Sequence, residues 1–360
     1  MIPHPYLLYL GDSTDELSAK TSRGVAVWRP ELCIGEYRGP DCTITLGLPH
    51  LGFAQGAARG AKTLIIGVAN AGGVMGARTV VDAIAALDAG LNVASGLHDR
   101  LSAHPGICAA AAAAGRQLFD VRAPPPHLDV GKGTRRAGRR LLTVGTDCSV
   151  GKMYTTLALE RELRARGMAA DFRATGQTGI FITGAGVPID AVVADFIAGA
   201  AEWISPARDD DGWDLIEGQG SLFHPSFAGV SLGLLHGAQP DALVLCDEPG
   251  RRHMRGIAGR PLPDLETCLA ANLEAARLTS PDVIAVGVAL NTSRLDRDAA
   301  ARACAAAEDR LGLPCEDPMM TGVGRITDRL LQRFAAPESP CAPQTTSARL
   351  PDRSGEAAYE

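Results

Sequence analysis

An anion-binding loop is the clearest chemical signal in this chain of 360 residues. Residues 145–152, GTDCSVGK, follow an apolar stretch at 139–145 and precede a helix predicted from about Lys152 to Gly167. Glycines let the backbone N–H groups of such a loop face one anion, while the helix N-terminus and Lys152 add positive charge. A strand before the loop and a helix after it are the context that this motif requires. We therefore predict a phosphate-binding loop formed by Gly145, Thr146, Asp147, Cys148, Ser149, Val150, Gly151, Lys152 and Met153.

The residue after Lys152 differs from that of ordinary ATPases. A Ser or Thr hydroxyl binds Mg²⁺ at that position in those enzymes, whereas Met153 has no oxygen to offer. Thr155 and Thr156 lie too far along the helix to take the same place. The loop is thus predicted to bind phosphate without the usual Mg·ATP chemistry, and we predict no resident metal.

A second glycine turn holds candidates for proton transfer. Residues 215–222, LIEGQGSL, run from a predicted strand into this turn and place Glu217 in it. Parallel strands bring such turns to one edge of the sheet, where ligands bind; a carboxylate that only caps a helix is the alternative. His224 is a candidate acid or base near neutral pH, with a structural role as the alternative. Cys148 is either a thiolate favoured by the helix N-terminus or a small loop residue.

Polar residues after two other predicted strands are candidates for binding ligands. Arg173, Thr175 and Gln177 lie in RATGQTGI, where the arginine offers a bidentate clamp for a carboxylate and the other two offer orienting hydrogen bonds. An exposed turn explains the same residues equally well. Asn291 ends the predicted strand 282–291, where asparagine is also a common turn former.

The first half of the chain contributes two more candidates. Asn70, in IGVANAGG, follows a predicted strand and precedes a helix, as in a Rossmann-like turn. His98, in SGLHD, follows another predicted strand and lines a cleft between two domains, with the capping of a turn as the alternative. The glycines near Asn70 do not match the Gly-x-Gly-x-x-Gly dinucleotide fingerprint, so NAD is not inferred.

Alternating strands and helices must position these residues. Strands are predicted at residues 7–11, 43–48, 63–70, 91–95, 139–145, 213–218, 241–247 and 282–291, and further helices at Ala77–Asp88 and Gly106–Gly115. Strands that are apolar along their whole length indicate parallel sheets covered by helices on both faces. The Pro-, Gly- and Arg-rich stretch between the halves predicts an extended linker. We predict an α/β protein with a Rossmann-like domain at 1–125, a linker at 126–139, a second α/β domain at 140–335 and a disordered tail at 336–360.

Composition excludes several classes of protein. The net charge of −6 argues against general nucleic-acid binding. No stretch approaches the ~18 apolar residues of a membrane helix, and no basic signal-peptide region is present, so we expect a soluble, cytoplasmic protein. The nine cysteines include no Cys-x-x-Cys pair, which argues against a disulfide framework or a zinc site.

Several motifs together resemble one known family. The segments GTDCSVGKMYT, ATGQTGI, EGQGSL, NAGG and SGLHDRL are similar to those of a two-domain bacterial P-loop family that includes D-glutamate N-acetyltransferase, over about residues 5–335. Met153 is typical of that family. The loop and the Glu-Gly-x-Gly segment also resemble those of dethiobiotin synthetase, which implies a P-loop NTPase-like C-terminal domain.

The resemblance implies an activity and a set of roles. It implies transfer of an acetyl group from acetyl-CoA to the amine of D-glutamate or a related amino acid, by a homodimer whose product passes to a partner racemase. The phosphate loop would bind the CoA phosphates and Asn291 the base. The acceptor would lie against Arg173, Thr175, Gln177, Asn70 and His98, and Glu217 or His224 would take the amine proton.

Two other functions remain open from the sequence. The first is an ATP-dependent ligase or kinase similar to dethiobiotin synthetase, which would require Mg²⁺ and use Glu217 as a metal ligand; Met153 counts against it. The second is a non-catalytic nucleotide or CoA sensor that closes its two domains on binding.

Overall fold

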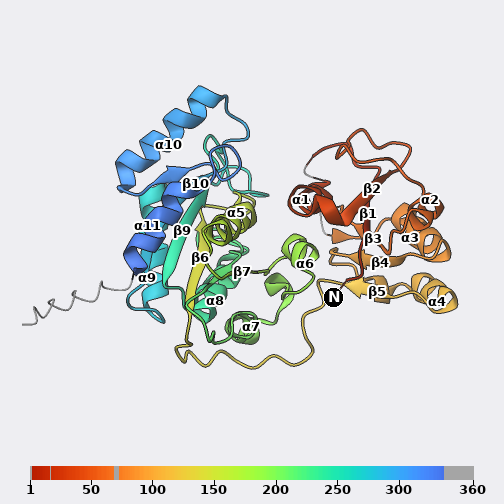
Figure 1. The fold of residues 1–360 in the computed structure, drawn as a ribbon, viewed down its shortest axis with the longest axis horizontal. Helices are drawn as coiled ribbons and strands as arrows, with labels where there is room; N and C mark the ends of the chain where they lie inside the picture. The colour runs from red at the N-terminus through yellow and green to blue at the C-terminus, as the bar shows by residue number, and fades with distance from the viewer. Residues whose placement is uncertain (1, 17, 69–72, 336–360) are drawn as a thin grey trace, which may run out of the picture.

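The computed structural model describes residues 2–16, 18–68 and 73–335. They form two β-sheets whose strands are all parallel and which lie side by side with helices between and around them (Figure 1). The predicted α/β class is therefore confirmed. Within the described ranges, no helix has both the length and the apolar character needed to cross a membrane. The predicted tail at 336–360 lies outside the described residues.

The first sheet has the strand order β2-β1-β3-β4-β5. Strand β1, which lies between β2 and β3, is buried along its whole length. The strands are β1 (Tyr6–Gly11), β2 (Cys33–Arg38), β3 (Thr63–Ile66), β4 (Asn92–Ser95) and β5 (Leu118–Asp120), and the helices are α1 (Lys20–Trp28), α2 (Phe53–Ala58), α3 (Ala77–Asp88) and α4 (Pro105–Ala114).

The strand predicted at residues 43–48 is wrong. This segment forms no strand, and β2 occupies the edge of the sheet instead. The buried carboxylate of Glu36 on β2 accepts hydrogen bonds from the Thr45 hydroxyl (2.6 Å) and the Leu46 backbone N–H (2.7 Å). The β-branched residues that suggested a strand therefore belong to a loop that one buried side chain anchors.

The second sheet has the order β11-β10-β9-β6-β8-β7, with β6 near its centre. The predicted helix after β6 ends at Ala165, and Gly167 follows two residues later with a φ of +80°, which suits a residue without a side chain. The strands are β6 (Arg139–Gly145), β7 (Ala170–Arg173), β8 (Trp213–Ile216), β9 (Ala242–Asp247), β10 (Ile284–Leu290) and β11 (Cys315–Glu316). The helices are α5 (Lys152–Ala165), α6 (Gln177–Thr183), α7 (Ile197–Ile204), α8 (Ala228–Ala238), α9 (Leu265–Arg277), α10 (Arg297–Leu311) and α11 (Gly324–Phe334).

The connection between the sheets is tied to the second one. Residues 121–138 contain no helix or strand. The backbone N–H groups of Lys132 and Gly133 donate to the Glu202 carboxylate on α7 (2.8–3.0 Å), and Arg136 donates to the Gly237 carbonyl on α8 (2.9 Å). The predicted linker is thus extended, but it is held along α7 and α8 rather than free.

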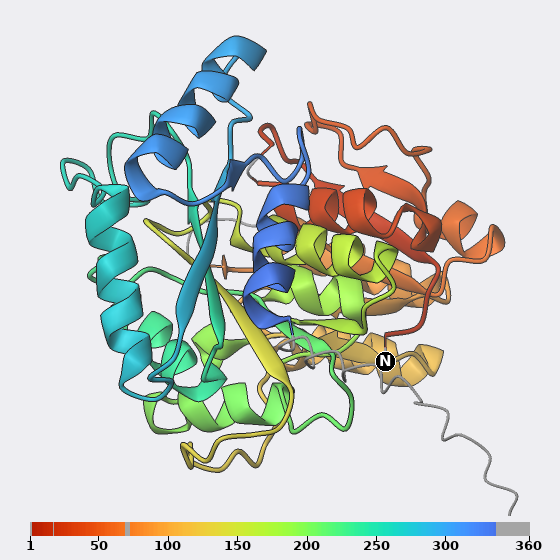
Figure 2. The same ribbon diagram turned by 60° about the vertical axis from the view of Figure 1, so that its left-hand side comes forward.

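Helix α1 of the first sheet packs against α5 and α6 of the second (Figures 1 and 2). The hydroxyls of Thr21 and Thr178 are 3.2 Å apart, and the rings of Trp28 and Tyr154 meet edge to face at 5.8 Å. A Cβ on Gly24 would lie 2.6 Å from the Thr178 methyl group. Only glycine therefore allows the two helices to approach this closely.

Candidate functional site

The phosphate loop joins β6 to α5 in the geometry that the sequence predicts. Ser149 and Gly151 have φ values of +56° and +101°, which turn the chain sharply into the helix. No acidic side chain lies in the first turn of α5, and no side chain caps it. The Lys152 ammonium curls back and donates to the Asp147 carbonyl at 2.7 Å. Free helix N–H groups and a buried lysine together make a site for an anion.

Neither threonine hydroxyl of α5 occupies a Mg²⁺-binding position. Thr155 Oγ1 donates to the Gly151 carbonyl (3.1 Å) and Thr156 Oγ1 to the Lys152 carbonyl (2.8 Å). The Met153 side chain faces α1, where its methyl group would lie 3.4 Å from a Cβ on Gly24. The donor set of this helix is therefore unlike that of an ordinary Mg·ATP site.

Glu217 lies beside the phosphate loop, next to Gly218, which packs on the Lys152 side chain. It is 4% exposed, and its Oε2 accepts hydrogen bonds from the N–H groups of Thr175 (3.0 Å) and Gly176 (3.1 Å). Burial raises the pKa of Glu217 to about 7, against the lowering effects of these two hydrogen bonds and of Lys152. A carboxyl group of this pKa can exchange a proton near neutral pH.

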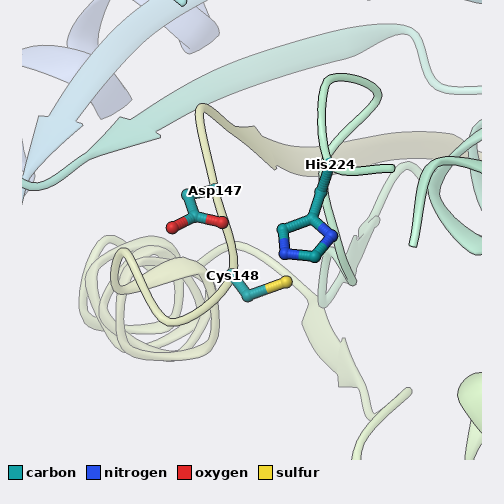
Figure 3. Close-up of side chains that lie close together, drawn as sticks. All are labelled: Asp147, Cys148 and His224. Carbon is teal, nitrogen blue, oxygen red and sulfur yellow. The ribbon is translucent and has the colours of Figure 1, made fainter. Parts of the chain in front are cut away.

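Asp147 and Cys148 of the loop form a cluster with His224 (Figure 3), with one polar or sulfur atom of each within 4.8 Å of the others. Asp147 Oδ2 pairs with the Arg251 guanidinium (2.9 Å) and accepts the Arg255 N–H (2.8 Å). Its Oδ1 is buried without a hydrogen-bond partner among the described residues. Asp147 thus forms an ion pair that holds the 251–255 segment against the loop.

Both ring nitrogens of His224 already have partners. Nδ1 accepts the Ser226 N–H (3.2 Å), so Nε2 carries the proton and faces the Arg255 carbonyl at 3.0 Å. The ring is 1% exposed and stacks on Phe227. These contacts do not favour the predicted role in proton transfer, and they leave no lone pair for a metal. Burial also raises the pKa of Cys148, against the opposing effect of Lys152, and the side chain therefore stays a thiol.

The three side chains predicted to bind the acceptor, those of Arg173, Thr175 and Gln177, have different partners and do not point to one place. The predicted clamp role of Arg173 is corrected: its Nε and Nη2 bind the buried Asp214 carboxylate at 3.0 and 2.8 Å. Arg173 pairs with Ile216, so Asp214, two residues earlier, lies on the same face of the sheet. Thr175 is fully buried and donates to the Glu217 carbonyl (2.6 Å). Of these three residues, Gln177 is the one whose side chain contacts the first-sheet half, at Gly96.

Gln177 joins a polar group between the two sheets. Its Oε1 accepts a hydrogen bond from Arg122 (2.7 Å), which also donates to the Gly96 carbonyl (2.7 Å) and pairs with Asp190. His98 is exposed on the first-sheet side, against Gly73. The other predicted residue of this half, Asn70, lies outside the described residues.

Asn291 packs on the phosphate loop, 3.6 Å from where a Cβ on Gly151 would lie. Its side-chain oxygen accepts the Ser293 N–H (3.3 Å), as in a turn. Nearby, a cavity of about 430 Å³ opens at the carboxyl ends of β9 and β10. Its lining includes Asp247, Arg251, Leu290, Ala307 and Arg310.

Sequence reasoning missed Lys20, Arg122, Arg251 and Arg255. None of them belongs to a recognised motif, and each interacts with residues that are distant in the sequence. The run GRRHMRG at 250–256 is the one local signal that could have drawn attention to the last two.

Comparison with known proteins places this geometry in a family. Residues 129–327 match the domain-of-unknown-function family DUF1611_C, described as a P-loop domain, and residues 39–124 match DUF1611_N, described as a Rossmann-like domain. The chain is 49% identical to a D-glutamate N-acetyltransferase of Tritonibacter scottomollicae, over 92% of this chain and 99% of that protein. It is 48% identical to a D-glutamate N-acetyltransferase of a Pseudoalteromonas species, over 91% and 99%. A crystal structure of a DUF1611 family protein from Anabaena variabilis is 32% identical with a TM-score of 0.84, over 92% of this chain and all of that one.

Proposed function

This chain belongs to the DUF1611 family, and from that premise we propose that it transfers the acetyl group of acetyl-CoA to the amine of D-glutamate, which gives N-acetyl-D-glutamate. The observation that carries the proposal is the likeness to two D-glutamate N-acetyltransferases over 99% of their length. The site supports it independently, because an anion-binding loop and a carboxyl group of near-neutral pKa lie side by side.

The phosphate loop is the part of the chain that fits CoA. Its free helix N–H groups and Lys152 suit phosphate oxygens, and no hydroxyl follows the lysine to hold Mg²⁺. The cavity beyond β9 and β10 has the apolar and polar lining that suits an adenine nucleotide. Acetyl-CoA supplies a thioester carbonyl group, which an uncharged amine can attack.

Glu217 is our candidate for the base that makes the amine uncharged. Two backbone N–H groups hold its Oε2, whereas Oε1 accepts no hydrogen bond among the residues that the structure describes. A Cβ on Gly176 would lie 3.2 Å from Oε1, so glycine keeps this oxygen uncrowded. At pH 7 a carboxyl group with a pKa of about 7 is substantially ionised, and it can therefore take a proton from the acceptor ammonium.

We propose that transfer is direct rather than through an acetylated cysteine. Cys148 is a thiol because burial raises its pKa, and His224 has no free lone pair to deprotonate it. After incubation with acetyl-CoA alone, intact-mass spectrometry should find unmodified protein. Stoichiometric gain of one acetyl group, lost in Cys148→Ser, would contradict direct transfer.

The activity itself is tested by product analysis. Purified protein is incubated with acetyl-CoA and D-glutamate, and mass spectrometry and thiol release are followed together. We expect N-acetyl-D-glutamate and free CoA in equal amounts, without added Mg²⁺. Release of ADP from ATP in the presence of Mg²⁺, with no acetylated product, would instead favour the ligase or kinase.

A further inference from the structure

Helix α1 of the first sheet begins with a lysine, Lys20, and packs against the residue that follows the phosphate loop. Gly24 of α1 lies against Met153, the residue that follows Lys152, and Lys20 begins the same helix one turn earlier. The helix is also fixed to its own sheet, because the Ser22 hydroxyl donates to the Tyr9 carbonyl and its N–H to the Gly67 carbonyl. The position of the helix that carries Lys20 is therefore set by packing on both sides.

Lys20 is partly buried, and no carboxylate among the described residues forms an ion pair with it. Its ammonium has no hydrogen-bond or ion-pair partner among the residues described here. Burial, together with the positive charges of Arg255 and Arg122, lowers the pKa of Lys20 to about 8, against the smaller effects of Cys148 and Asp190. Asp190, the carboxylate that interacts electrostatically with Lys20, is already paired with Arg122.

Arg255 approaches from the other domain and also lacks a carboxylate within the described part of the chain. Its guanidinium bonds to the Ser149 hydroxyl of the phosphate loop. Its backbone is pinned by Asp147 and His224, which bond its N–H and its carbonyl group. Two cations, one from each domain, thus interact here: Arg255 bonds to Ser149, and Lys20 interacts electrostatically with Arg255 and with Cys148. Such an excess of charge suits a bound anion.

We propose that Lys20 and Arg255 form an anion clamp, which holds a carboxylate or phosphate group of a substrate between the two domains. The proposal rests on the function proposed above, and the group has two possible sources. The acceptor D-glutamate carries two carboxylates, and CoA carries phosphates. The backbone of Arg255 is already fixed by Asp147 and His224, and Lys20 from the other domain supplies the second positive charge of the clamp.

The test compares Lys20→Met with Lys62→Met, an exposed lysine on the first sheet that serves as the matched control. Calorimetric titration measures the dissociation constants for acetyl-CoA and for D-glutamate, and steady-state kinetics measures KM for D-glutamate and D-glutamine. Lys20→Arg keeps the positive charge and tests rescue. Thermal unfolding shows whether each variant is folded, and Arg255→Met supplies a second variant of the clamp.

We expect Lys20→Met to weaken one ligand by at least about tenfold, as for the loss of a charge-assisted contact, with partial rescue in Lys20→Arg. If Lys20→Met raises KM for D-glutamate but not for D-glutamine, the clamp binds the side-chain carboxylate. If KM rises equally for both amino acids, the clamp binds the α-carboxylate. A loss for acetyl-CoA alone assigns a phosphate. Unchanged affinities for both substrates in Lys20→Met and Arg255→Met would overturn the clamp, even in a protein that proved unable to transfer acetyl groups.

Discussion

The two buried carboxylates beside the phosphate loop are held in opposite ways. Asp147 forms an ion pair with Arg251 and accepts the Arg255 N–H, so its charge is matched by a cation that also fixes the loop. Glu217 accepts two backbone N–H groups and has no ion pair among the residues described, and burial raises its pKa to about 7. The difference separates a carboxylate that stabilises structure from one that is available to exchange a proton.

The largest expected effect comes from Lys152, which interacts electrostatically with both carboxylates. In Lys152→Ala the loop loses its buried positive charge, and we expect kcat/KM for acetyl-CoA to fall about 10³-fold, as for the loss of a buried charged partner. Lys132→Ala removes an exposed lysine of the connection and is the control. A fall of less than about threefold in steady-state assays would remove the loop from CoA binding.

Glu217→Gln tests the proton-transfer side of the comparison. We expect kcat to fall at least about 10²-fold, because the amide cannot accept the amine proton. In the wild type, kcat/KM should fall as the pH drops below about 7, since the carboxylate becomes protonated. That acidic limb should be absent from the residual activity of the variant. Near-wild-type turnover, or an unchanged pH profile, would exclude Glu217 as the base.

Stability should change in opposite directions at the two carboxylates. The pKa of Glu217 is raised in the folded protein, so its stabilising contribution is complete below about pH 4.5 and is lost as the pH rises through about 7. The stability of Glu217→Gln relative to wild type should therefore increase by about 2 kcal/mol as the pH is raised from 5 to 8.5. Asp147→Asn should lose about 2 kcal/mol through its broken ion pair. Denaturant unfolding at pH 5 and 8.5 measures these changes in the free energy of unfolding. If the change has the same sign in both variants, the two carboxylates do not differ in the way described.

Local patterns in the sequence predicted the phosphate loop and most strands. The loop depends on consecutive residues between a strand and a helix, and Gly145–Lys152 therefore has the predicted structure. Arg173 failed as a clamp because a sequence does not show which buried acid will face an arginine across a sheet. Lys20 was missed because only the packing of α1 on α5 and α6 places its helix beside the loop, and Arg255 because only its contacts with Asp147 and Ser149 bring it there.

The central claim is that the phosphate loop binds acetyl-CoA rather than Mg·ATP. Calorimetric titration of the wild-type protein with acetyl-CoA, and separately with ATP and Mg²⁺, tests this most directly. We predict that acetyl-CoA binds, that its binding is lost in Lys152→Ala, and that ATP with Mg²⁺ gives no heat of binding. Binding of ATP that requires Mg²⁺, with no binding of acetyl-CoA, would contradict the acetyltransferase account.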